Sequence, residues 1–427
     1  MSYIQKVSSY IEKNRSEYER LLQEMVQQPS KAGGESGIQD IVEKRLSEKG
    51  FDVDRWELDY EALSKHTYFC ASRPDFTGSE NVVGVLKGEG EGKSLILNGH
   101  VDVVPEGERV QWEHDPYSGA IRGNKLFGRG ATDMKGGNLS ALLAVEAIQA
   151  LGIKLKGDII FQSVVEEESG GSGTLAAIER GYTADAALIP EPTNMTIFPK
   201  QQGSMWFKVH IYGKSAHGGT RYEGVSAIQK VHTVHEAILQ LEQERNERLD
   251  SPLYEGNPIP VPINVGKIAG GTWPSSVPDQ VTIEGRMGVI PGEDLLEAKA
   301  ALEAKLAALA KEDSWFAEAP VEVEWFGARW LPGEIEDDHP FLHSLIQAYH
   351  SYKNEDPVLK ASPWGTDGGL LTALRGIPAV VFGPGETSMA HYPNEFINLD
   401  HVFEAAVIMA ETILQWCEVA SVNESVH

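Results

Sequence analysis

The order of strand-like and helix-like segments constrains the fold of this chain more than any other feature. Short apolar runs alternate with helical stretches in the first half of the chain: 82–86, 94–104, 134–151 (helical), 158–165 and 185–190. Such alternation is typical of an α/β domain with a mostly parallel sheet. Amphipathic helices over residues 1–27 and 37–49 are expected to precede it.

This pattern is interrupted in the middle of the chain. Residues 203–329 show the order strand, helix, strand, strand, helix, strand, which predicts a ferredoxin-like (βαββαβ) unit. After about Trp330 the α/β pattern resumes, with a strand at 379–385 and a closing helix. A chain of 427 residues is long for a single core. We therefore expect one discontinuous domain, 1–202 and 330–427, and one inserted domain, 203–329.

Charge and cysteine content exclude several classes of function. The formal net charge of −26 disfavours nucleic acid and anionic membranes as partners. The two cysteines, Cys70 and Cys417, cannot form a disulfide framework, so a reducing cytoplasm is the expected location. The charged N-terminal segment lacks the apolar stretch of a signal peptide, and no apolar run has the length of a membrane span.

Five clusters of histidine or acidic residues follow predicted strands or glycine-rich turns: His100 with Asp102, Asp133, Glu166 to Glu168, Glu191, and His391. In open α/β sheets, ligands bind at the carboxyl ends of the strands. The clusters therefore stand where a functional site is expected.

Each cluster alone also has an ordinary explanation. His100 could be a hydrogen-bonded histidine at a strand end, and Asp133 could cap the following helix. The three glutamates could form a solvated loop, although carboxylates beside an apolar strand repel one another unless a positive charge lies among them. Glu191, fixed between two prolines, and His391 could be plain loop residues.

Taken together, the clusters supply imidazole and carboxylate ligands without thiolates. This donor set suits Zn²⁺, Mn²⁺ or Co²⁺. The number of ligands fits two metal ions that share Asp133, each with an open position for water.

Six motifs follow one another along essentially the whole chain: GHVDVVP, GRGATDMKGG, EEESGGSG, EPT, GKSAHGG and AHYPNE. In this order the chain resembles the zinc-dependent exopeptidase and deacylase family that includes acetylornithine deacetylase, succinyl-diaminopimelate desuccinylase, aminoacylase and glutamate carboxypeptidase. The resemblance implies an α/β zinc-exopeptidase catalytic domain with an inserted lid and dimerisation domain.

The resemblance also implies roles for individual residues. Ligands to two zinc ions, with cobalt or manganese as alternatives, would be as follows: His100 and Glu191 for one ion, Glu168 and His391 for the other, and Asp133 shared between them. Glu167 would be the general base, and Asp102 would support His100. Glu166 aligns with the aspartate that the family usually carries before the pair.

Further residues are expected on the substrate side. The resemblance implies that His217 is a lid histidine, supplied by the partner subunit of a homodimer to polarise the scissile carbonyl. Arg286 either binds a substrate carboxylate or forms a surface salt bridge. Ser276 stands where many relatives have asparagine, Gly385 is another substrate-binding candidate, and Asn394 replaces a common aspartate.

The predicted function is metal-dependent hydrolysis of an amide bond in a small acylated amine or amino acid, as in acetylornithine deacetylase. One alternative is deformylation of an N-formyl aminopyrimidine in thiamin salvage. The segments EEESGG, KQQGSMW and AHGGTRYEG resemble a deformylase of this family and favour this alternative. Another is a dipeptidase or carboxypeptidase. A non-catalytic relative is disfavoured because all five ligands and the base are present, and a Ser/His/Asp hydrolase because no GxSxG elbow occurs.

Overall fold

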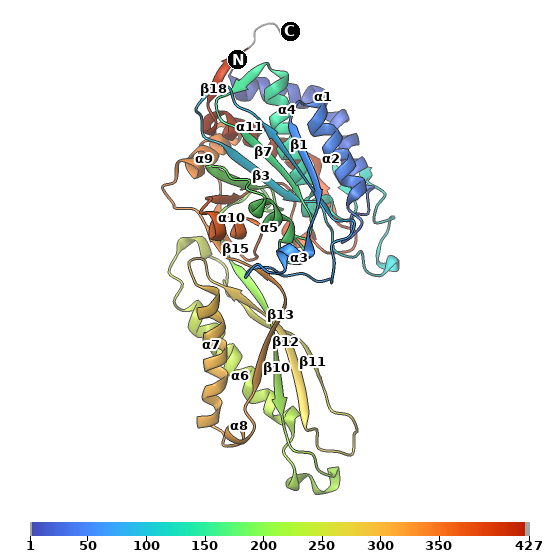
Figure 1. Cartoon of the computed structure of the whole chain (residues 1–427), viewed down its shortest axis with the longest axis vertical. Helices are drawn as coiled ribbons and strands as arrows, with labels where there is room; N and C mark the ends of the chain where they lie inside the picture. The colour runs from blue at the N-terminus through green and yellow to red at the C-terminus, as the bar shows by residue number, and fades with distance from the viewer. Residues whose placement is uncertain (1, 423–427) are drawn as a thin grey trace. The chain divides into compact units, whose positions relative to one another are not determined.

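The computed structural model describes residues 2–422, which divide into two compact units (Figure 1). Unit 1 comprises Met1–Gln201, Gly333–Ala361 and Thr366–His427, and unit 2 comprises Gln202–Pro332 and Ser362–Gly365. Within the described part of the chain, no helix combines the length and apolarity needed to cross a membrane.

Unit 1 is built on a nine-stranded sheet. Its strands follow one another in this order: β1 (Asp52–Glu57), β2 (Glu80–Leu86), β7 (Ile159–Val164), β3 (Leu95–His100), β8 (Ala186–Ile189), β16 (Ala379–Val381), β9 (Ile197–Gln201) and β14 (Gly333–Glu334), with β15 (Leu359–Ser362) beside β9. The central pairs β7–β3, β3–β8 and β8–β16 are parallel, and antiparallel pairs flank them. The predicted parallel sheet is thus confirmed for its centre.

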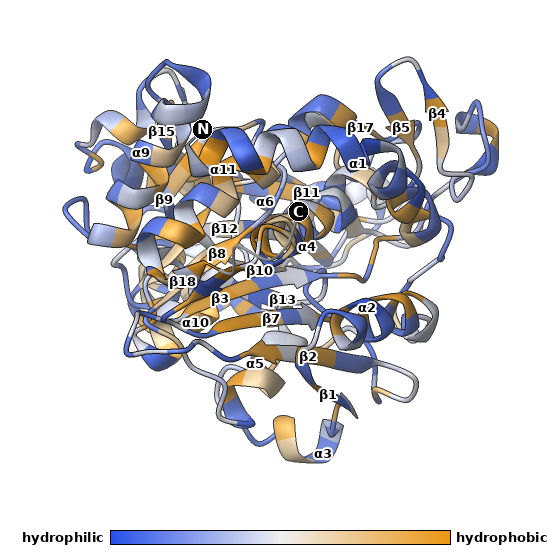
Figure 2. Cartoon of the chain, turned by 90° about the horizontal axis from the view of Figure 1, so that it is seen from above, coloured by the Kyte–Doolittle hydropathy of each residue, from blue (hydrophilic) through white to orange (hydrophobic). Residues whose placement is uncertain are grey.

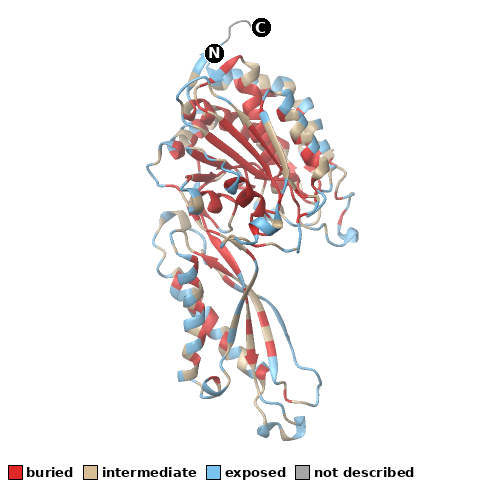
Figure 3. Ribbon diagram, viewed as in Figure 1, coloured by how far each residue is buried: buried red, intermediate tan, exposed pale blue. Residues whose placement is uncertain are grey.

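The central strands β3, β7, β8 and β16 are buried along their whole length, which explains their continuous apolar sequences (Figure 3). Helices cover them: α1 (Tyr3–Val26), α2 (Ser36–Glu48), α3 (Tyr60–Leu63), α4 (Gly136–Ala150), α5 (Ser172–Glu179), α9 (Pro340–Lys353), α10 (Gly368–Arg375) and α11 (Leu399–Trp416). Figure 2 shows α1, α4 and α11 on one side of the sheet and α5 on the other. The side chains of α4 and α11 are almost all buried, so these two helices form the centre of the core.

Two small sheets complete unit 1. One contains β4 (Ala120–Arg122), β5 (Lys125–Phe127) and β17 (Phe396–Asn398), and the other contains β6 (Ile153–Leu155) and β18 (Val419–Val422). The first brings the segment around residue 396 beside the segment around residue 127, although these are far apart in the sequence.

Unit 2 has the predicted βαββαβ order, formed by β10 (Gly203–Tyr212), α6 (Ala227–Asn246), β11 (Ile263–Gly270), β12 (Gln280–Val289), α7 (Leu295–Ala307) and β13 (Glu322–Trp330), with the short α8 (Trp315–Glu318) before β13. The sheet order is β11–β12–β10–β13, and every neighbouring pair is antiparallel. This is the strand order of a ferredoxin-like sheet, so the predicted fold of the insertion is confirmed. Alternate residues of β10, Phe207, Val209 and Ile211, are buried.

Candidate metal centre

Three neighbouring parallel strands deliver the first part of the site. His100 is the last residue of β3, Glu167 and Glu168 follow β7, and Glu191 follows β8. His100 pairs in register with Val164, the last residue of β7. Because parallel strands end at one edge of the sheet, their terminal side chains converge there.

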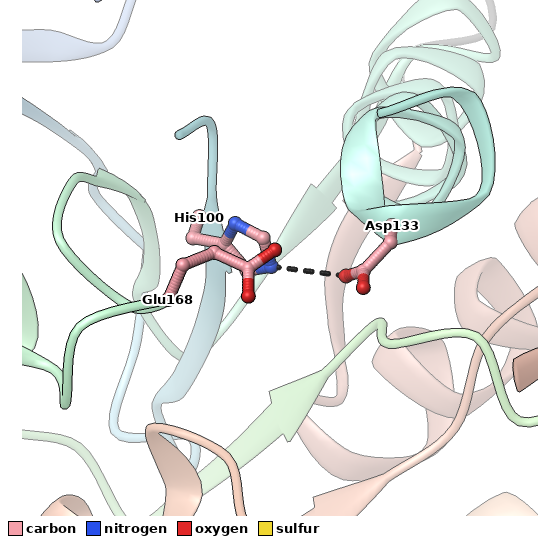
Figure 4. Close-up of side chains that lie close together, drawn as sticks. All are labelled: His100, Asp133 and Glu168. Carbon is pink, nitrogen blue, oxygen red and sulfur yellow. Dashed lines mark hydrogen bonds and ion pairs between the residues drawn. The ribbon is translucent and has the colours of Figure 1, made fainter. Parts of the chain in front are cut away.

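Asp133 lies between two histidines rather than capping a helix. It belongs to the turn Ala131–Lys135 that precedes α4, and the N-terminus of α4 has no side-chain cap. Asp133 Oδ1 lies 3.2 Å from His100 Nε2, and Asp133 Oδ2 lies 3.1 Å from His391 Nε2. Figure 4 shows Asp133 directed toward His100, with Glu168 beside them. Each carboxylate oxygen therefore has its own imidazole, which is the arrangement required of a carboxylate that bridges two ions.

The remaining ligand candidates, Glu168, Glu191 and His391, lie close to the same two histidines or to Asp133. His391 Nε2 lies 3.1 Å from Glu168 Oε1, and His100 Nε2 lies 3.6 Å from Glu191 Oε1. Two sets of residues have potential ligand atoms within 4.8 Å of one another in the described chain: His100, Asp133 and Glu168, and His100, Glu167 and Glu191. The second set includes Glu167, the predicted base, so this carboxylate lies within reach of the predicted ligands. His391 is the most accessible member, with its side chain 52% exposed.

Asp102 holds the site together through the backbone. Its carbonyl oxygen lies 2.9 Å from His100 Nδ1, which leaves His100 Nε2 free as a ligand atom when Nδ1 carries the proton. Its carboxylate accepts hydrogen bonds from the backbone N–H groups of Glu167, at 3.3 Å, and Glu168, at 3.2 Å. Asp102 thereby fixes both the imidazole and the glutamate loop.

Glu166 differs from the two glutamates that follow it. Its carboxylate is buried, forms an ion pair with Arg73 at 2.7 Å and accepts a hydrogen bond from Ser169 Oγ at 2.5 Å. Its backbone has a φ of +61°, and a turn begins here, in which the Glu166 carbonyl accepts a hydrogen bond from Gly171 N–H at 2.8 Å. The carboxylate of Glu166 is thus bound by Arg73 and Ser169 rather than by His100 or His391.

The electrostatics of the cluster call for additional positive charge. Burial, followed by the neighbouring carboxylates, raises the pKa of Glu167 and Glu191 well above the usual value. Burial also raises the pKa of Asp102. Hydrogen bonds to Asp133 and Glu168 raise the pKa of His391 to about 10. When no cation lies among these groups, the shifts favour the protonated forms of Glu167, Glu191 and Asp102 and the charged form of His391. Asp133 differs, because burial is outweighed by hydrogen bonds from His100 and His391 that lower its pKa.

The basic residues nearby do not supply this charge. Arg73 pairs with Glu166, Arg129 pairs with Glu395, and Lys135 donates to the backbone carbonyl of Gln28 at 2.8 Å. The donor set, nitrogen and oxygen without sulfur, fits divalent zinc, manganese or cobalt. The residues present therefore fit a metal centre.

Two buried acids near the site were not predicted. Glu395 Oε1 accepts hydrogen bonds from the backbone N–H groups of Thr132, at 2.9 Å, and Asp133, at 3.2 Å. Asp367 accepts a hydrogen bond from Thr174 Oγ1 at 2.8 Å, and burial raises its pKa to about 6. Glu395 lies inside the motif AHYPNE, in which His391 is the predicted ligand. No local sequence pattern distinguishes Glu395 itself as a functional residue.

The predicted substrate-side residues lie in both units. In unit 2, His217 is exposed, pairs with Ser276 in an isolated β-bridge and has its Nδ1 hydrogen-bonded to the Gly219 N–H. The guanidinium of Arg286 has no hydrogen-bond or ion-pair partner among residues 2–422, and burial lowers its pKa. In unit 1, Gly385 has a φ of +88°, and a Cβ there would meet Thr132 Oγ1 at 2.5 Å, so this turn packs against the loop of Asp133. Their roles toward substrate stay predictions.

Comparison with known proteins shows the family of the chain. The model of peptidase family M20/M25/M40 matches residues 96–415. The N-formyl-4-amino-5-aminomethyl-2-methylpyrimidine deformylase of Bacillus subtilis is 32% identical over 403 residues, covering 89% of each chain. The protein with the same name from Halalkalibacterium halodurans is 30% identical over 442 residues, covering 98% of each.

A solved structure shares the fold. The di-peptidase Dug1p of Saccharomyces cerevisiae superimposes with a TM-score of 0.73 at 15% identity, covering 99% of this chain and 100% of the other. The chain belongs to peptidase family M20/M25/M40, and it is a metal-dependent hydrolase of amide bonds.

Proposed function

We propose that the chain binds two divalent metal ions, zinc with cobalt or manganese as alternatives, and removes a small acyl group from an amine. The ligands are those predicted: His100 and Glu191 for one ion, Glu168 and His391 for the other, and Asp133 for both. The observation that carries this proposal is the position of Asp133, whose two carboxylate oxygens each face a different histidine at 3.1–3.2 Å.

Glu167 is proposed to move the proton. When bound, the ions would polarise the amide carbonyl and lower the pKa of water at the site. Glu167 is buried beside the ligands, and burial raises its pKa, which makes the ionised carboxylate a stronger proton acceptor. In the proposed reaction it accepts the proton of water and returns it to the leaving amine. Asp102 orients it through the backbone N–H of Glu167.

The substrate class is proposed from the named relatives and from Arg286. The two deformylases span nearly the full chain at 30–32% identity, so an N-formyl aminopyrimidine is the first candidate substrate. Arg286 favours a second candidate, an N-acyl amino acid. A desolvated guanidinium without an ion-pair partner in the described residues is suited to bind a carboxylate.

A substrate panel with Arg286→Met separates these candidates. We expect the unmodified protein to hydrolyse N-formyl-4-amino-5-aminomethyl-2-methylpyrimidine most efficiently, and Arg286→Met to change its kcat/KM by less than about threefold, because this substrate has no carboxylate. For N-acetylornithine, the variant is expected to raise KM by about tenfold or more, as loss of a charge-assisted hydrogen bond predicts. Initial rates with Zn²⁺ and with Co²⁺ provide the measurement.

Lys305→Met is the control for this panel, because Lys305 lies on helix α7 of the same unit and is paired with Glu244. It should leave all rates unchanged. A panel in which no acylated amine is hydrolysed would rule out the proposed activity, and an equal effect of Arg286→Met on both substrates would rule out its selective role.

The protein is also proposed to form a homodimer through unit 2, with His217 acting in the partner's site. Strand β11 lies at the edge of the sheet, and its residues after Gly266 are exposed. Ile268 on this strand is 60% exposed. An exposed edge strand with an apolar side chain such as Ile268 is suited to pair with another strand, and a second copy of the chain offers the same edge.

If the protein is a stable dimer, light scattering should give a mass near twice 46.8 kDa that does not change with protein concentration. Ile268→Lys should shift the protein toward the monomer and lower activity in parallel, since His217 would then lose its partner site. Val358→Lys, at a position 55% exposed in unit 1, is the matched control and should stay dimeric. A monomer with full activity would contradict both the dimer and the role of His217.

A further inference from the structure

A buried ion pair connects the two loops that carry Asp133 and His391. Arg129 and Glu395 are 2% and 0% exposed, and Arg129 Nη1 donates to Glu395 Oε2 at 2.6 Å. Neither side chain belongs to the cluster of predicted ligands, and the proposed reaction uses neither. Charged pairs are rarely buried unless they are well hydrogen-bonded, so the remaining contacts of this pair are informative.

Glu395 holds the turn that presents Asp133. Its second oxygen, Oε1, accepts hydrogen bonds from two successive backbone N–H groups, those of Thr132 and Asp133. The backbone carbonyl of Glu395 accepts a further hydrogen bond from Gly128 N–H at 2.9 Å. The carboxylate thus fixes the backbone of Asp133 and leaves the Asp133 side chain free for the two histidines.

Arg129 holds the loop that presents His391. Its second terminal nitrogen, Nη2, donates to the backbone carbonyl of His391 at 3.2 Å and to that of Pro105 at 3.4 Å. His391 has a φ of +63°, a left-handed conformation that costs free energy for a histidine and has to be maintained by its surroundings. Asn394, whose φ is +59°, anchors the same loop by donating to Gln111 O and accepting from Glu113 N–H.

We propose that Arg129 and Glu395 are positioning residues that set the distance between Asp133 and His391, each by binding the backbone of one ligand. The inference rests on the proposed metal centre. Because the guanidinium and the carboxylate bind each other, neither loop can shift without breaking a buried, charge-assisted hydrogen bond. The pair therefore acts on the ion that Asp133 and His391 are proposed to share, through ligand geometry and without contact to substrate.

Metal titration of Glu395→Gln tests the inference. Glutamine keeps the volume and one acceptor oxygen but removes the charge opposite Arg129. The purified full chain is stripped of metal and titrated with Co²⁺, with ions per chain measured by elemental analysis and the visible Co²⁺ spectrum recorded. We expect about 10–100-fold weaker binding of at least one ion and an altered spectrum, as is typical when a residue that orients metal ligands is lost. Arg129→Lys, which keeps the charge, should retain tighter binding than Arg129→Met.

Glu146→Gln is the matched control. Glu146 is also 0% exposed on its side chain, pairs with Arg45 at 2.7 Å and accepts a hydrogen bond from Tyr18 at 2.7 Å. It lies ten residues beyond the first residue of α4, about 15 Å along the helix axis. This variant should lower Tm while leaving Co²⁺ affinity and spectrum unchanged.

The results distinguish failure of the positioning role from failure of the proposed metal centre. If Glu395→Gln folds, as circular dichroism would show, and binds two Co²⁺ ions within about twofold of the unmodified affinity, the positioning role is overturned. The same conclusion follows if Glu146→Gln weakens Co²⁺ binding equally, or if Arg129→Met binds as tightly as Arg129→Lys. If the unmodified chain itself takes up no Co²⁺, the metal centre fails instead.

Discussion

Replacing Glu167 with glutamine is expected to lower kcat by about 10²–10⁴-fold while the protein keeps its full metal content. Glutamine has nearly the same shape but cannot accept a proton from water or return one to the leaving amine. Glu167 is buried beside His100 and Glu191, which places its carboxyl within reach of the proposed ligands. Single-turnover rates and metal analysis of the same preparation provide the measurement.

The neighbouring surface offers a control for this variant. Glu179→Gln, at the exposed last residue of α5, changes the same functional group and should leave kcat unaltered. Near-normal turnover in Glu167→Gln would remove Glu167 from the mechanism. Loss of metal together with activity would instead show that Glu167 is a ligand, which its proximity to His100 and Glu191 also permits.

Removal of metal is expected to abolish activity and to destabilise unit 1, increasingly so as pH rises. An ion that binds only the folded state at a thousand times its Kd contributes about 4 kcal/mol to the free energy of unfolding. Without it, Glu167 and Glu191 have raised pKa values and His391 has a pKa of about 10, so the folded protein binds more protons than the unfolded chain. The stability contributed by these groups is full below their unfolded pKa values and is lost as pH rises.

The expected measurement is a pair of Tm profiles between about pH 5 and pH 9, with and without Zn²⁺. The metal-free Tm should fall as pH rises, and the difference between the profiles should widen, because metal displaces the protons that its ligands carry. His350, an exposed histidine outside the cluster, provides a control: His350→Gln should leave both profiles unchanged. Parallel profiles would contradict the charge balance described for the site.

Local sequence was sufficient for the residues at strand ends. His100, Glu168 and Glu191 follow apolar runs, and the geometry of parallel strands brings such positions together without further information. The direction of an outer strand could not be predicted in the same way, since β2 has an apolar sequence similar to those of the central parallel strands but pairs antiparallel with β7. An apolar run indicates that a strand is buried, but not whether the strand runs parallel or antiparallel to its neighbours.

The arrangement around the ligands depends on contacts that no local pattern contains. The run Glu166 to Glu168 does not reveal which carboxylate faces the site, because this depends on the turn that begins at Glu166 and on Arg73, which lies 93 residues away. Likewise, Arg129 and Glu395 are separated by 266 residues, and each lies in a motif where another residue is the more obvious ligand. Long-range ion pairs of this kind are visible only in the folded chain.

The position of β16 between β8 and β9 has a consequence for synthesis of the protein. The ribosome releases β8 and β9 first, then all of β10 to β13, and only afterwards Ala379–Val381 and His391. At about 5–20 residues per second, the apolar edges of β8 and β9 stay without their central partner for on the order of 10 s. During this interval they are open to pairing with other nascent chains. Assembly of the proposed metal centre therefore has to follow translation of His391, and chaperone dependence should be greatest before β16 is made.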